Sequence, residues 1–317
     1  MQNREVIQLK RRLLAFLLVL AVLFSATVTF AEDDEDWDDE DWGDEEFEDD
    51  EESFDEEEGK VDFRTIAGYD QGETFTCGDY VYKLAEDGQS ALLTNYSGTS
   101  GDIVIPDTVD GHPVIAVGAH MFAYNQVVEN IQFPDSIQAI GNMAFFKCAN
   151  LKAVTIPEGV KFIDECCFGG CDLLEEVHLP DSLEEVGRFG FLACLSLKNV
   201  TFGTGLRTIG IGAFQKCVSL ESVEIPEGTT VLEESCFDGC DLLAAVQFPD
   251  SLTEVGNLSF HACISLKEAV FGSALQSIGD GAFQECGALS RVVLPGDQVT
   301  IGEDAFTDCA PNLEIVQ

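Results

Sequence analysis

The twelve cysteines are the residues most able to do chemistry in this 317-residue chain. In an oxidising compartment such residues form disulfides, and closely spaced pairs can bind a metal ion. Eight of them, however, occupy one position that recurs every 23 residues: Cys148, Cys171, Cys194, Cys217, Cys240, Cys263, Cys286 and Cys309. Residues stacked in this way aim their Cβ atoms in parallel rather than at each other. The spacing therefore predicts a ladder of mostly reduced thiols that pack as small hydrophobic groups.

The densest thiol cluster is formed by Cys166, Cys167 and Cys171, and Cys236 and Cys240 repeat its four-residue spacing. Two cysteines at this spacing could supply two metal ligands. The position of Cys167 and Cys236 is nevertheless filled by alanine in other repeats, at Ala144, Ala213, Ala282 and Ala305. This pattern favours small-residue packing over a metal site. Cys166 lies outside the ladder, and we expect it to be an exposed, reactive thiol.

The four histidines, His112, His120, His178 and His261, share no metal-ligand spacing. We expect His178 and His261 to lie on different faces of the repeat. No serine-hydrolase elbow, phosphate-binding loop or His-Glu-x-x-His sequence occurs. The sequence thus predicts no catalytic residue, no metal site, no cofactor and no enzymatic activity.

Phenylalanines recur at the same period of 23 residues: Phe122, Phe145, Phe168, Phe191, Phe214, Phe237, Phe260, Phe283 and Phe306. Each phenylalanine from Phe145 onward stands three residues before a ladder cysteine. A strict period of this length indicates one supersecondary unit stacked many times, with the phenylalanines as its main core column. Rows three repeats apart are the most similar, which indicates duplication of a 69-residue block.

One row shows which elements position these columns. Residues 151–157 read Leu-Lys-Ala-Val-Thr-Ile-Pro, a short strand that Pro157 ends because proline donates no ladder hydrogen bond. The three-residue spacing from phenylalanine to cysteine predicts one turn of 3-10 or α helix. Most rows carry glycine after an apolar residue, but Asp164 and Glu233 replace it in two rows. A positive φ is therefore not required there, and we expect a close backbone approach.

The repeated row Ile-Gly-x-x-Ala-Phe-x-x-Cys-x-x-Leu-x-x-Val-x-Ile-Pro resembles the bacterial BspA-like (Treponema-type) leucine-rich repeats. The resemblance covers about residues 102–317, and residues 78–114 resemble the segment that often opens such arrays. It implies a curved leucine-rich-repeat solenoid with one strand and one short helical turn per 23 residues, and a parallel sheet on its concave face. It also implies export or surface display, often with a role in adhesion. We expect an N-terminal capping segment at 59–113, including the first strand, and about nine coils at 114–317.

Solenoids commonly bind partners through the outward side chains of their strands. The small residues Ala153 and Ala245 and the apolar residues Val270 and Val293 fall at such positions. The candidate ligand-binding residues of the concave face are Asn130, Gln132, Thr155, Glu176, His178, Asn199, Thr201, Ser222, Glu224, Gln247, Glu268 and Arg291. This set lacks the aromatic and arginine cluster of a strong protein-binding hot spot.

The first 58 residues differ in composition from the repeats. Residues 1–31 combine a basic start, an apolar run and a small-residue cleavage site, which predicts a signal peptide. An uncleaved anchor is the alternative, but the apolar run is short for a span. Residues 32–58 hold 21 acidic residues and no basic one, which predicts a disordered acidic spacer. Trp37, Trp42, Phe47 and Phe54 interrupt this spacer and could form a docking motif.

The remaining residues, 59–317, hold 37 acidic and 12 basic side chains, a formal charge of −25. Such a field repels nucleic acid and anionic membranes, so neither is an expected partner. The leading hypothesis is a secreted or cell-surface, non-enzymatic binding or adhesion module that engages an extracellular protein or glycan. The alternative is a structural protein that self-associates end to end through the final strand at 313–317, where Pro311 disturbs the repeat.

Overall fold

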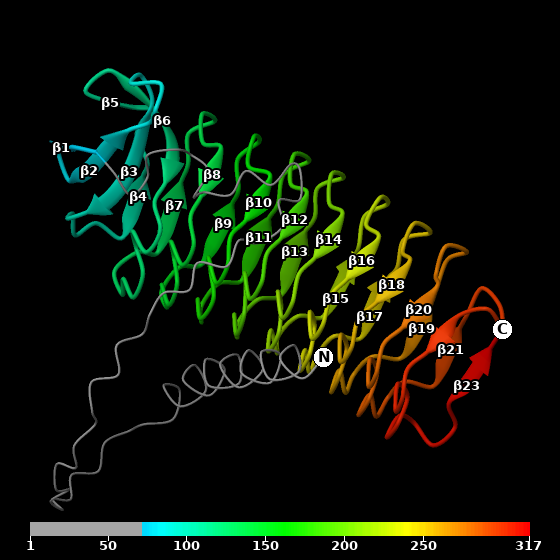
Figure 1. Cartoon of the computed structure of the whole chain (residues 1–317). Helices are drawn as coiled ribbons and strands as arrows, with labels where there is room; N and C mark the ends of the chain where they lie inside the picture. Colours follow the sequence, from blue (N-terminus) through cyan, green and yellow to red (C-terminus); the bar gives the residue numbers. More distant parts are fainter. Residues whose placement is uncertain (1–71) are drawn as a thin grey trace, which may run out of the picture. The chain divides into compact units, whose positions relative to one another are not determined.

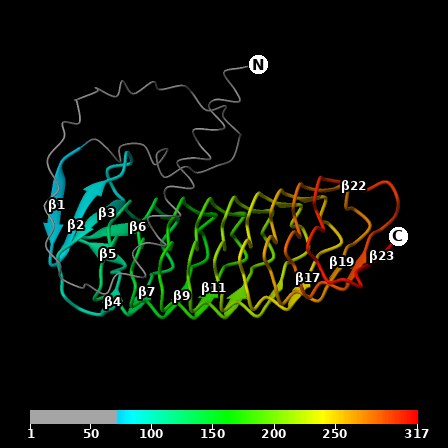
Figure 2. The ribbon, with the colours of Figure 1, turned by 90° about the horizontal axis from the view of Figure 1, so that it is seen from below.

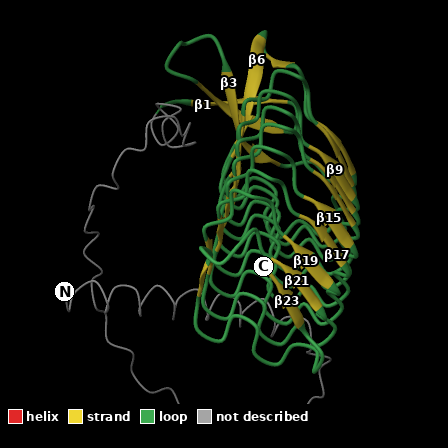
Figure 3. Ribbon diagram, turned by 90° about the vertical axis from the view of Figure 1, so that its right-hand side faces the viewer, coloured by secondary structure: helices red, strands yellow, loops and turns green. Residues whose placement is uncertain are grey.

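The computed structural model describes residues 72–317, and this part of the chain is a parallel-strand solenoid without helices (Figure 1). The predicted signal peptide, the acidic spacer and residues 59–71 of the predicted cap lie outside the described residues. Successive coils are 23 residues long and stack along one axis, as Figure 3 shows from the C-terminal end. The prediction of a leucine-rich-repeat solenoid with a parallel sheet is confirmed.

One long side of the solenoid carries three-residue parallel strands, and we call the exposed surface of these strands the strand face (Figure 2). Hydrogen-bonded ladders join them in groups of five, two and three strands. The strands are β4 (Asp102–Val104), β7 (Asn130–Gln132), β9 (Ala153–Thr155), β11 (Glu176–His178), β13 (Asn199–Thr201), β15 (Ser222–Glu224), β17 (Ala245–Gln247), β19 (Glu268–Val270), β21 (Arg291–Val293) and β23 (Glu314–Val316).

A second parallel sheet, which the sequence did not predict, runs along the other side of the coils. Its strands are two residues long and pair in strict order from β10 to β22. They are β10 (Phe162–Ile163), β12 (Glu185–Val186), β14 (Thr208–Ile209), β16 (Val231–Leu232), β18 (Glu254–Val255), β20 (Ser277–Ile278) and β22 (Thr300–Ile301); the equivalent two-residue strand of the preceding coil, β8 (Ala139–Ile140), pairs instead with the N-terminal sheet. Pairs of residues are too short to show an alternating pattern in the sequence, so only stacking reveals them.

An N-terminal sheet precedes the regular coils. β1 (Thr74–Cys77), β2 (Tyr80–Leu84) and β3 (Ala91–Tyr96) form an antiparallel meander, and β5 (Thr108–Val109) makes a hairpin with β6 (His112–Val117). β6 pairs in parallel with both β3 and β8. It therefore joins this sheet to the first coil and crosses the boundary that we placed between residues 113 and 114.

The segment from phenylalanine to cysteine is not helical, which corrects that part of the prediction. Cys148 N does donate to Phe145 O at 3.1 Å, as a 3-10 turn requires, but Phe145 N donates to Cys167 O of the next coil at 2.9 Å. Left-handed residues four apart, such as Met143 (φ 52°) and Lys147 (φ 55°), redirect the chain before a helix can form. The result is a series of tight turns, which we call the turn segment of each coil.

The glycine before the turn segment behaves as the sequence predicted. Its φ is not positive in any described coil. A Cβ placed on Gly187 would lie 2.4 Å from the carbonyl oxygen of Ile163, and one on Gly210 would lie 2.7 Å from that of Val186. These glycines thus permit a close approach between coils rather than an unusual backbone conformation.

The phenylalanine column fills the solenoid as a continuous stack of rings. Consecutive centroids from Phe122 to Phe306 are 5.0–5.6 Å apart, with interplanar angles of 3–12°. Tyr96 extends the stack at its N-terminal end, 5.4 Å from Phe122, and Tyr80 follows 5.1 Å from Tyr96. All rings of the column are buried except Phe306, which is half-buried. The column therefore forms one core along the whole described array.

Candidate functional site

The strand face places every predicted binding residue on the surface. Both outward positions of each strand from β7 to β19 are exposed, while the middle residue points inward. The ladder register aligns these side chains in rows along the solenoid. Glu176, for example, lies between Ala153 and Asn199, and His178 lies between Thr155 and Thr201. The structure thus brings the twelve candidates onto one surface, but it contains no ligand that would test their role.

Basic side chains beside the strand face are paired with carboxylates one coil away. Lys198 Nζ lies 2.8 Å from Glu175 Oε2, Arg291 Nη1 lies 3.3 Å from Glu268 Oε2, and Lys152 pairs with Glu129. The Glu175 carboxylate raises the pKa of Lys198. Exposed pairs of this kind add little stability, but they neutralise the cations of the face. The strand face therefore presents neutral polar groups and carboxylates over most of its length.

One of the two outward rows of the strand face is apolar at its C-terminal end. Val270, Val293 and Val316 are in register on β19, β21 and β23, and Val270 is 44% exposed. The equivalent positions of β7 and β9 carry Gln132 and Thr155. The neighbouring row of the same three strands is charged, so a partner on these coils would meet charged and apolar side chains in adjacent rows.

The cysteine ladder packs against the phenylalanine column, and all twelve cysteines are free. Each ladder thiol donates to the carbonyl oxygen of the phenylalanine 26 residues earlier, as Cys217 Sγ does to Phe191 O at 3.2 Å. Seven of the eight are buried and Cys309 is half-buried. Burial raises the pKa of Cys148 and Cys286 to about 12, and it also raises the pKa of Cys217. These thiols are poor nucleophiles and poor metal ligands, because both roles require the thiolate.

The expectation that Cys166 is exposed and reactive was wrong. Its side chain is only 1% exposed, and burial together with the Glu165 carboxylate raises its pKa to about 12. The residues at the same position one coil away are Met143 and Phe189. The equivalent Ser235, whose counterparts are Gly212 and Leu258, is only half-buried. Equivalent positions of the repeat therefore differ in exposure.

The histidines lie in different surroundings. His178 is exposed on β11, whereas His261 lies in a turn segment, so the prediction of different faces is confirmed. His112 Nδ1 lies 2.8 Å from Gln89 O, and His120 has a positive φ of 58°. Within residues 72–317, no three His, Cys, Asp or Glu side chains are placed to hold one metal ion.

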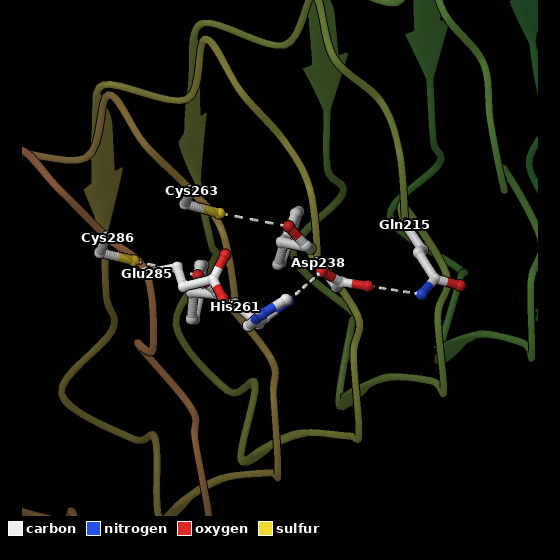
Figure 4. Close-up of polar contacts among 8 residues, drawn as sticks. Gln215, Asp238, His261, Cys263, Glu285 and Cys286 are labelled. Carbon is white, nitrogen blue, oxygen red and sulfur yellow. Dashed lines mark hydrogen bonds and ion pairs between the residues drawn. The ribbon is translucent and has the colours of Figure 1, made fainter. Parts of the chain in front are cut away.

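A polar cluster on four adjacent turn segments was missed by the sequence reasoning (Figure 4). Gln215 Nε2 donates to Asp238 Oδ2 at 2.6 Å, and His261 Nδ1 lies 2.8 Å from Asp238 Oδ1. Glu285 Oε1 lies 3.8 Å from His261 Nε2 on the other side of the ring. Gln215, Asp238 and His261 are spaced by 23 residues, so aligning the rows by the repeat would have revealed the column.

Among residues 72–317, neither the strand face nor the polar cluster around Asp238 contains a complete set of catalytic residues. The Asp238–His261 pair resembles the orienting half of a hydrolase triad, but no serine or thiol is hydrogen-bonded to the imidazole. Among the described residues, no helix is long and apolar enough to cross a membrane.

Comparison with known families identifies the repeats. A family model described as "BspA type Leucine rich repeat region" matches six copies, at residues 115–244 and 185–314. The chain belongs to the BspA-type leucine-rich-repeat family. The resemblance inferred from the row pattern is therefore confirmed. BspA-type proteins are generally surface proteins with binding or adhesion roles, and they are generally not enzymes.

The solved structures that resemble this chain include bacterial leucine-rich-repeat proteins. A leucine-rich repeat protein from Bacteroides ovatus is 24% identical, covering 76% of this chain and 70% of its own, with a TM-score of 0.56. A Treponema pallidum leucine rich repeat protein is 25% identical over 76% of this chain and 91% of its own, with a TM-score of 0.48. A leucine rich cell surface protein from Faecalibacterium prausnitzii is 23% identical over 78% and 95%, with a TM-score of 0.36. No curated protein matches the chain.

Proposed function

We propose that this protein is a secreted or surface-displayed binding module that engages an extracellular protein or glycan through its strand face. The observation that carries the proposal is the array of exposed outward side chains on the strands from β7 to β19, which are aligned in register within each of the three ladders. Family membership and the signal-peptide pattern of residues 1–31 support the compartment. The sheet is built from backbone and core contacts, so its outward residues are free to vary with the ligand.

The direct test is recovery of the protein on extracellular-matrix and cell-wall fractions. The face variant combines Glu176→Gln, His178→Gln, Asn199→Ala and Glu224→Gln. The control variant combines Glu86→Gln and Glu303→Gln, which removes the same two negative charges from exposed positions outside the strand face. We expect the face variant to lose recovery and the control to keep it. Equal recovery of the two variants would contradict binding through the strand face.

Self-association is a second candidate, favoured by the apolar surface of β23. All three residues of this strand are exposed, and Ile315 is 43% exposed although it is an inward position in other coils. Strand edges of this kind pair readily with other chains. Light scattering of a variant that lacks residues 311–317 separates the two candidates, because only self-association requires these residues. A wild-type protein that is monomeric at micromolar concentration would eliminate the second candidate.

A further inference from the structure

The imidazole of His261 is held in one orientation by the side chains of the two preceding coils. Both oxygens of Asp238 accept a hydrogen bond, one from Gln215 and one from His261 Nδ1, at 2.6 and 2.8 Å. Because a carboxylate only accepts, the Nδ1 atom must carry the proton of the neutral ring. The lone pair of Nε2 is then directed away from Asp238. This arrangement leaves His261 ready to act as a ligand through Nε2.

The group that faces Nε2 is a second acceptor. Glu285 Oε1 lies 3.8 Å away, which is too long for a hydrogen bond. The side chains of Asp238, His261 and Glu285 are 13%, 28% and 56% exposed, so the ring is partly covered while the gap beside Glu285 opens to solvent. Two acceptors that point toward one gap are the surroundings of a cation.

We propose that His261 Nε2 and Glu285 together bind a transition-metal ion of the Zn²⁺ type, with Asp238 as the residue that positions the imidazole. Zinc bonds to histidine nitrogen and carboxylate oxygen are about 2.0–2.2 Å long, so two such ligands lie about 3.4 Å apart at a tetrahedral angle and about 4.2 Å apart when collinear. The observed 3.8 Å falls between these limits. A small rotation of the exposed Glu285 side chain completes the geometry.

The chemistry of the cluster selects the class of ion. An imidazole ligand suits Zn²⁺, Co²⁺ or Ni²⁺, whereas Ca²⁺ and Mg²⁺ prefer oxygen ligands alone. A metal-binding histidine commonly donates its second ring N–H to a carboxylate, as His261 does to Asp238. This hydrogen bond fixes the tautomer and raises the basicity of the nitrogen that binds the metal. The formal charge of −43 on the chain further concentrates divalent cations near its surface.

Two protein ligands leave positions on the ion open. A structural zinc site has four protein ligands and a catalytic site has three, so this ion would keep water or accept a group from another molecule. The site lies on turn segments rather than on the strand face, and its proposed role is independent of the binding function proposed above.

The test is a Zn²⁺ titration of the full chain, followed by the imidazole resonances of the four histidines in NMR spectra. We expect the His261 resonances to shift at lower Zn²⁺ concentration than those of the exposed His178. His261→Gln should abolish this binding event, and Asp238→Asn should weaken it about ten- to hundredfold. Glu285→Gln should also weaken it, whereas His178→Gln should leave it unchanged.

Two controls separate the proposed site from other Zn²⁺-binding groups of the chain. Circular dichroism shows whether each variant keeps the wild-type fold, and Glu285→Gln, at an exposed position, provides a test if Asp238→Asn unfolds the coil. The proposal is overturned if Zn²⁺ binds with equal affinity to wild type and His261→Gln. It is also overturned if the His261 resonances stay unchanged at millimolar Zn²⁺, whether or not the ion binds at thiols or acidic residues elsewhere.

Discussion

The buried thiols should make the solenoid unusually sensitive to alkali. Burial raises the pKa of Cys148, Cys166 and Cys286 to about 12, from a usual value of 9.0. Burial also raises the pKa of six further thiols: Cys167, Cys171, Cys217, Cys236, Cys240 and Cys263. Between pH 9 and 12 the unfolded chain loses these protons while the folded chain keeps them. Stability is therefore complete below pH 9 and falls as the pH rises above it.

The magnitude follows from the three thiols whose pKa is raised to about 12. For one thiol with a pKa of 9.0 unfolded and about 12 folded, the free energy of unfolding falls by about 0.4 kcal/mol at pH 9 and by about 1.4 kcal/mol at pH 10. Three such thiols together lower it by about 4 kcal/mol between pH 8 and pH 10, and the other buried thiols lower it further. Because a typical domain is stable by only about 5–15 kcal/mol, this loss should be a large part of the total stability.

The assay is guanidinium unfolding at pH 8, 9 and 10, followed by far-ultraviolet circular dichroism with reductant present throughout. Circular dichroism is preferred because both tryptophans, Trp37 and Trp42, precede the repeats. The variant Cys167→Ala/Cys236→Ala removes two buried thiols from a position where other coils already carry alanine. We expect it to lose less stability between pH 8 and pH 10 than wild type does, because burial raises the pKa of both thiols. Ser222→Ala on the strand face, which removes no titrating group, is the control.

The comparison of pH slopes is decisive because it does not depend on the stability of each variant at pH 8. If the double variant and wild type lose stability in parallel, the thiols are not the cause of alkaline unfolding. If wild type keeps its pH 8 stability at pH 10, the thiols are not buried in their protonated form and the packing argument fails.

Three further predictions concern the core and the turn segments. Phe214→Leu should destabilise the protein more than Phe306→Leu does, because Phe214 is fully buried between two rings whereas Phe306 is half-buried at the end of the stack. Thermal unfolding should therefore give the lower midpoint for Phe214→Leu. Ala262→Gly should stabilise the protein by about 0.5–1 kcal/mol, because a φ of 55° strains alanine and not glycine, and equilibrium unfolding that shows destabilisation would contradict this. Ala282→Gly, at a fully buried position without a positive φ, is its matched control and should instead destabilise by about 1 kcal/mol.

Residues within one row determined much of the fold. The 23-residue period identified the coils, and the apolar spacing around Val154 together with Pro157 located the strands of the strand face. The replacement of glycine by Asp164 and Glu233 correctly predicted a close approach rather than a positive φ. These features could be predicted because the apolar pattern of a strand, the proline that ends it and the length of the repeat are local properties of the sequence.

The failures share one cause, which is contact between coils. The turn segment was expected to be helical because its hydrogen bonds to the next coil, such as Phe145 N to Cys167 O, have no trace in a single row. The second sheet was missed because strands of two residues are defined only by their neighbours. Tyr96 and Tyr80 extend the ring stack although they lie outside the period of 23 residues.

The sequence by itself therefore determined the repeat, the identity of the core columns and the outward positions of the strands, because each depends on spacing along the chain. Only the tertiary structure decided which groups meet across coils. It buried Cys166, and it joined Asp238 to His261. The physical reason is that stacking places residues 23 apart in direct contact, so the volume and charge of the next coil set the environment of each side chain.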